Sequence, residues 1–97
     1  MGFTVSTKAA KWFKEEFELA PGDHVTFFAK IYGGIPTIYP DYFLGISINE
    51  KEGIPTIKVV GEGITFYIAN GDKWLVDGYD LRVEIKNNEV DCIFTES

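Results

Sequence analysis

The sequence holds few side chains that could do chemistry, and the densest group of them forms an aromatic loop. Tyrosine rings beside glycine and proline often line binding surfaces, because the ring is apolar and the hydroxyl is polar. The same rings can instead cover the open side of a small hydrophobic core. The loop therefore either contacts a protein or small ligand, or shields the core from solvent. Its candidate contact residues are Tyr32, Gly33, Gly34, Tyr39, Tyr42 and Phe43.

Cys92 is the single cysteine, so an internal disulfide is excluded. It has the same parity as Val90 and Phe94, which places it on the core face of the last expected strand, where free cysteines are commonly buried. One thiol does not build a chelating site by itself. We expect a structural cysteine, with a metal or redox role as the alternative.

The remaining candidates are a lone histidine and a group of aspartates. His24 follows Asp23 at a strand entrance, and neighbours in a strand point to opposite faces, so we expect an exposed or capping histidine rather than a base. Asp72, Asp77 and Asp80 could bind a hard cation. Their spacing differs from that of a calcium loop, and an aspartate before glycine is typical of a turn.

One helix is expected near the start of the chain. Ser6 stands at the position of an N-cap, and Ala9, Phe13 and Phe17 follow at helical spacing. We expect the helix to stop at Pro21-Gly22.

After the helix, the apolar residues alternate with a period of two, which predicts strands. The longest pair, residues 25–31 and 42–48, is joined through the bend at Gly33-Gly34. Residues 35–41 contain Pro36 and Pro40, each of which removes a backbone donor, so we expect a loop there. Further strands are expected at residues 3–5, 57–60, 64–68, 81–86 and 90–94, with a helical turn at 72–76 and a polar turn at 49–55.

These elements predict a mainly β fold in one domain, residues 1–97: a small β-sandwich or pseudo-barrel of short strands, with one N-terminal α-helix packed on it. The formal charge of −6 repels phosphates, so we expect no nucleic-acid partner. No apolar run reaches the length of a membrane span and no signal-peptide pattern begins the chain, so we expect cytoplasmic residence. The apolar loop and a short edge strand at residues 3–5 leave a homodimer open.

The order of these elements resembles the HesB/IscA-like family, the A-type iron–sulfur cluster assembly proteins, over nearly the whole chain. VSTKAAKWFKEEF is similar to the end of the family's first strand and its capped helix. VTFFAKIYGG resembles the strand before its central glycine loop. The nearest match is GITFYIANGDKWLVDGYDLRVEI, where a strand runs through a helical turn and an Asp-Gly into another strand.

The resemblance implies a cluster site that this sequence does not complete. Cluster-carrying members place one cysteine directly after the loop glycine and two more in a Cys-Gly-Cys tail. Here Gly34 follows Gly33, and Cys92 lies inside a strand. Because iron–sulfur centres need thiolate ligands, the resemblance implies a short branch of the family that lacks the ligating cysteines and holds no cofactor.

Two functions are open at this point. The first is an accessory or binding module related to iron–sulfur cluster biogenesis, in which the loop from Gly33 to Phe43 contacts a protein partner or a small ligand. The second is an iron-handling protein with oxygen and nitrogen ligands, or a ligand-binding protein unrelated to iron–sulfur metabolism. We expect no enzyme, because the sequence shows no nucleophile–base pair and no cofactor motif. The candidate ligands of the iron-handling alternative are His24, Tyr32, Asp41, Asp72, Asp77, Asp80 and Cys92.

Overall fold

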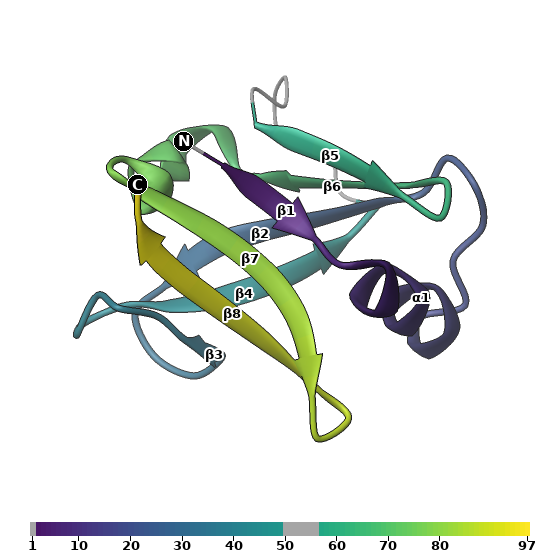
Figure 1. Ribbon diagram of the computed structural model, residues 1–97, viewed down its shortest axis with the longest axis horizontal. Helices are drawn as coiled ribbons and strands as arrows, with labels where there is room; N and C mark the ends of the chain where they lie inside the picture. Colours follow the sequence, from purple (N-terminus) through teal and green to yellow (C-terminus); the bar gives the residue numbers. More distant parts are fainter. Residues whose placement is uncertain (1, 50–56) are drawn as a thin grey trace.

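Two β-sheets enclose one hydrophobic core in the computed structural model, which describes residues 2–49 and 57–97 (Figure 1). One sheet has the strand order β1-β7-β8 and the other β3-β4-β2-β6-β5. At their margins β1 lies close to β5, and β3 lies close to β8, so the sandwich approaches a closed barrel. The elements are β1 (Phe3–Val5), α1 (Thr7–Glu16), β2 (His24–Lys30), β3 (Ile35–Pro36), β4 (Phe43–Ile48), β5 (Lys58–Gly61), β6 (Ile64–Ile68), the 3₁₀ helix η1 (Asn70–Val76), β7 (Tyr79–Lys86) and β8 (Glu89–Glu96). The expected mainly β fold with a packed N-terminal helix is confirmed.

Strand β2 is the centre of the larger sheet. It runs antiparallel to β4, pairing Val25 with Ile48 and Lys30 with Phe43. On its other side it runs parallel to β6, which comes from a distant part of the sequence. In the smaller sheet, β1 likewise runs parallel to β7. Each sheet therefore combines parallel and antiparallel pairs, so neither is a simple succession of hairpins.

Helix α1 begins as expected but ends earlier than expected. The hydroxyl oxygen of Ser6 accepts from the backbone N–H of Ala9 at 3.0 Å, as an N-cap does. The helix ends at Glu16, before Pro21, because Glu18 takes a positive φ of 51°. The backbone N–H of Leu19 then donates to the carbonyl of Lys14 at 2.9 Å. This is a Schellman motif without glycine. Because glycine is the usual sequence signal for the motif, the sequence does not predict this helix end.

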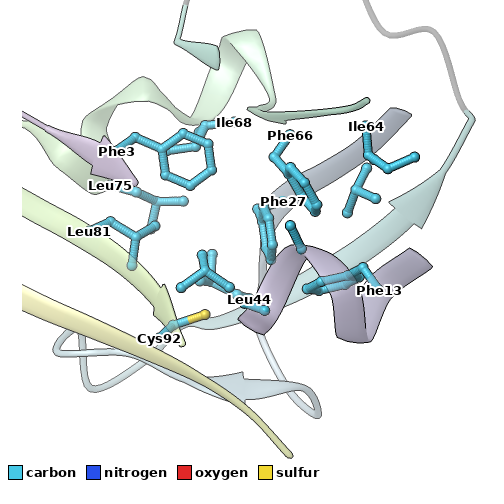
Figure 2. Packing of buried hydrophobic residues seen from close by; sticks show 14 of the residues in the cluster. Phe3, Phe13, Phe27, Leu44, Ile64, Phe66, Ile68, Leu75, Leu81 and Cys92 are labelled. Atoms are coloured by element: carbon cyan, nitrogen blue, oxygen red, sulfur yellow. The ribbon is translucent and has the colours of Figure 1, made fainter. Parts of the chain in front are cut away.

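The core is built around three phenylalanines that carry no exposed surface. The ring of Phe13 from α1 lies 5.9 Å from that of Phe27 in β2 and 5.4 Å from that of Phe66 in β6, edge-to-face in both cases. Figure 2 shows these rings together, with Leu44 beside them and the sulfur of Cys92 pointing into the cluster. Helix α1 is thus held onto the larger sheet by aromatic contacts as well as by apolar burial.

Two expectations about the loops change. Residues 35–41 are not loop throughout, because Ile35–Pro36 forms the short edge strand β3, pairing Ile35 with Leu44. An edge strand can hold a proline, since one side of its backbone has no partner strand. The polar turn expected over residues 49–55 lies, apart from Asn49, outside the described residues. Among the described residues, no helix is both long and apolar enough to cross a membrane.

Candidate functional site

The bend at Gly33-Gly34 connects β2 to β3 and lies against the first residues of β4. Both glycines take positive φ angles, 71° and 121°. A Cβ on Gly34 would lie 2.5 Å from the backbone oxygen of Leu44, whereas a Cβ on Gly33 would meet no atom within 4 Å. Gly34 is therefore required by a close backbone approach that places β3 against β4.

The tip of the β3–β4 hairpin is stabilised by its own polar groups. The hydroxyl of Thr37 accepts from the backbone N–H of Tyr39 at 3.0 Å and lies 2.8 Å from the carbonyl of Tyr42, to which it can donate. The backbone N–H of Tyr42 donates to the carbonyl of Tyr39 at 3.1 Å. These bonds close a turn with Pro40 and Asp41 at its centre.

Tyr39 attaches this hairpin to the 3₁₀ helix η1. Its hydroxyl lies 2.9 Å from the carbonyl of Leu75 and 3.3 Å from that of Trp74, and it donates toward both. Its ring packs edge-to-face on those of Trp74, Tyr79 and Phe94, at centroid distances of 5.2, 6.2 and 6.0 Å. Desolvation by burial, followed by the charges of Tyr79 and Asp77, raises the pKa of Tyr39 above its ordinary value.

Next to Tyr39, two rings face solvent together. Tyr42 and Trp74 lie 4.9 Å apart in an edge-to-face pair, and 37% and 38% of their surfaces are exposed. Ile38, in the same hairpin, is 43% exposed. We call the ring pair of Tyr42 and Trp74 the aromatic surface. Tyr32, in the bend after β2, is 78% exposed, and the register of Lys30 with Phe43 puts that bend at the same end of the sheet.

The structure separates the residues of the expected loop into different roles. Tyr42 and Tyr32 are exposed, and Phe43 is half-buried in β4. Tyr39 is half-buried and mainly holds the hairpin in place, and Gly34 shapes the bend. The sequence analysis missed Trp74, although an indole between two aspartates in a short helical turn is a visible signal. Only the fold brings it against the hairpin.

The other candidate residues are structural or dispersed. Cys92 is 8% exposed, and burial, with a smaller effect of Asp91, raises the pKa of its thiol to about 12, as expected for a structural cysteine. The backbone N–H of His24 donates to the side-chain oxygen of Asn49 at 2.8 Å. Within residues 2–49 and 57–97, no three His, Cys, Asp or Glu side chains gather as a metal site would require.

Asp72, which was expected only to form a turn, binds a backbone N–H of a distant strand. Its carboxylate accepts from the backbone N–H of Ala29 in β2 at 3.0 Å, a bond across 43 positions. Just before this point, Phe27 accepts from the backbone N–H of Ala69, at the end of β6. Asp72 therefore satisfies the β2 donor that lies beyond the reach of β6.

These features define a small mainly β protein with an exposed aromatic surface and a buried thiol. No family model matches the sequence. The chain is 32% identical over 94 residues to a Bacillus subtilis protein named pyruvate dehydrogenase inhibitor, covering 97% of both chains. It is also 31% identical over 94 residues to an uncharacterized protein of Staphylococcus saprophyticus, covering 96% of this chain and 95% of that one. The chain belongs to the family of the Bacillus subtilis pyruvate dehydrogenase inhibitor.

This membership overturns the interpretation of the chain as a HesB/IscA-like protein. The full-length relative is named for inhibition of an enzyme, and nothing in the comparisons points to iron–sulfur cluster assembly. The prediction of an accessory module in iron–sulfur biogenesis is therefore wrong. Its iron-handling and small-ligand alternatives draw no support from the comparisons. The misleading signal was an order of strands, a helical turn and an Asp-Gly, which reports on local structure and not on function.

Proposed function

We propose that this protein inhibits pyruvate dehydrogenase by binding to the enzyme, and that it is not itself an enzyme. The observation that carries the proposal is the 32% identity to the Bacillus subtilis inhibitor over 97% of both chains. Coverage of this extent means that the relative has no additional domain to which inhibition would have to be assigned. We expect the protein to act in the cytoplasm, where it would meet this partner.

The side chains of the described residues support a binding role. The one thiol is buried, and burial holds its pKa far above neutral pH, so it is a poor nucleophile. The aromatic surface, in contrast, exposes two aromatic rings on segments that Tyr39 holds together. Exposed tryptophan and tyrosine side chains are enriched among the residues that dominate protein–protein binding energy. We place the contact with the enzyme at the loop from Gly33 to Phe43, together with Trp74.

The direct test is an activity titration. Purified Bacillus subtilis pyruvate dehydrogenase is assayed for NADH formation with increasing amounts of this protein, and binding is measured in parallel on the immobilised protein. We expect activity to fall with the same concentration dependence as binding. An unrelated NAD-dependent dehydrogenase, assayed in the same buffer, should keep its full activity. Unchanged pyruvate dehydrogenase activity at a hundredfold molar excess of the protein would refute the proposal.

A further inference from the structure

The aromatic surface is preorganised, since two separate segments of the chain build it and the half-buried Tyr39 joins them. Tyr42 comes from the β3–β4 hairpin and Trp74 from η1. Tyr39 donates to the backbone of η1 and packs edge-to-face against Trp74, so it holds the hairpin that carries Tyr42 beside the helix that carries Trp74. A surface that is ordered before binding loses little conformational entropy when a partner arrives.

The charges around this surface are mostly negative. The two segments, residues 31–42 and 70–80, contain four carboxylates and one lysine: Asp41, Asp72, Asp77, Asp80 and Lys73. Asp41 and Asp77 are exposed, one beside Tyr42 and the other after η1. The backbone N–H of Asp77 donates to the carbonyl of Trp74 at 3.2 Å, so Asp77 directly follows the turn that carries the indole. Lys30, at the end of β2, lies along the sheet with its side chain against Gly45.

From this arrangement we infer that the aromatic surface receives a basic segment of the partner enzyme. Arginine or lysine side chains would lie against Tyr42 and Trp74, and Asp41 and Asp77 would pair with them. The inference rests on the proposed function and specifies its partner chemistry. Cations bind best over the indole face, and neighbouring carboxylates add to the attraction. We call Asp41 and Asp77 the acidic rim of the aromatic surface. A second copy of this chain fits poorly, because it would bring a net charge of −6 and the same acidic rim against this one.

Charge reversal at the rim, compared with the same reversal elsewhere, is the sharpest test. The double variant Asp41→Lys/Asp77→Lys changes the charge beside the rings. The matched control, Glu16→Lys/Glu62→Lys, changes the net charge equally at exposed positions on α1 and on the β5–β6 turn. Inhibition of pyruvate dehydrogenase is titrated for both variants at 50 and 300 mM salt. The thermal melting curve of each variant shows that it is folded.

We expect the rim variant to need at least tenfold more protein for half-inhibition at low salt, with the control within about threefold of wild type. A third variant, Trp74→Leu, keeps an apolar side chain but removes the ring, and we expect a three- to tenfold loss. Equal inhibition by the rim variant and its control would overturn this inference while leaving the proposed function standing. Failure of the wild-type protein to inhibit or bind the enzyme would overturn the proposed function, and this inference with it.

Discussion

The hydroxyl of Tyr39 donates a hydrogen bond of 2.9 Å to the carbonyl oxygen of Leu75, which lies 36 positions further along the chain. The acceptor is one of the last carbonyls of η1, which lack partners within the helix. A single phenol therefore satisfies a helix end and attaches the β3–β4 hairpin to it. The position of the aromatic surface depends on this contact.

Replacing Tyr39 with phenylalanine should destabilise the protein by about 1 kcal/mol, since it removes the hydrogen bond and keeps the ring packing. The measurement is urea denaturation followed by fluorescence. Tyr32→Phe is the matched control, because Tyr32 is 78% exposed and should unfold like wild type. Equal stability of the two variants would show that the Tyr39 bond contributes nothing net.

Alanine substitution at the two bend glycines should have unequal effects. Both positions have positive φ, which costs an alanine about 1 kcal/mol. Gly34→Ala also drives a Cβ to 2.5 Å from the Leu44 backbone oxygen, so we expect it to be the more destabilising variant by about 2 kcal/mol or more. Denaturation midpoints of Gly33→Ala and Gly34→Ala compare the two directly. A larger loss at Gly33 would contradict the close approach described for Gly34.

Asp72 should contribute through its acceptor oxygen. Asp72→Ala leaves the Ala29 N–H without its partner, and we expect a loss of about 1–3 kcal/mol. Asp72→Asn retains a side-chain oxygen at the same distance along the side chain, so it should recover more than half of that loss. Chemical denaturation of the two variants, together with amide exchange at Ala29, measures the effect. If the asparagine and alanine variants were equally destabilised, the bond would not be the cause.

The buried thiol predicts a specific dependence of stability on alkaline pH. Burial raises the pKa of Cys92 from 9.0 to about 12. The folded state therefore binds this proton more tightly than the unfolded state does. Its stabilising contribution is complete below pH 9 and declines as the pH rises toward 12. Between pH 8 and 10.5, wild type should lose about 2 kcal/mol more stability than Cys92→Ala.

Thiol chemistry checks the same prediction independently. At pH 8 the native protein should react with a thiol reagent far more slowly than the protein unfolded in urea, because Cys92 is only 8% exposed. Rapid modification without denaturant would show an accessible thiol, and the pH prediction would then lose its basis.

Much of the local structure was predictable because its causes are local. The Ser6 cap, the apolar spacing of α1 and the alternation in β7 follow from neighbouring residues. The turn at Asn87-Asn88 was also expected, and both residues take positive φ. The early end of α1 was not predictable, because a non-glycine residue adopts the left-handed conformation there. The edge strand β3 was missed because Pro36 and Pro40 suggest a loop, although the pairing of β3 with β4 tolerates Pro36.

The candidate site was only partly predictable. The aromatic loop stands out in the sequence by composition, but the sequence does not distinguish Tyr39, which faces inward, from Tyr42, which faces solvent. Whether these residues contact a partner stays a prediction. The expected function in iron–sulfur biogenesis rested on a resemblance in the order of elements. The full-length relative, which is named for inhibition of an enzyme, contradicts that expected function.

The start of the helix, most of the strands and the mainly β character of this acidic protein could be read from the sequence. These features depend on composition and on residues a few positions apart. The pairing of β2 with β6, the bond from Ala29 in β2 to Asp72, and the contact of Trp74 with Tyr42 arise only in the folded structure. These long-range contacts depend on which distant segments bury the most apolar surface together and satisfy each other's backbone hydrogen-bonding groups. No local pattern contains that information.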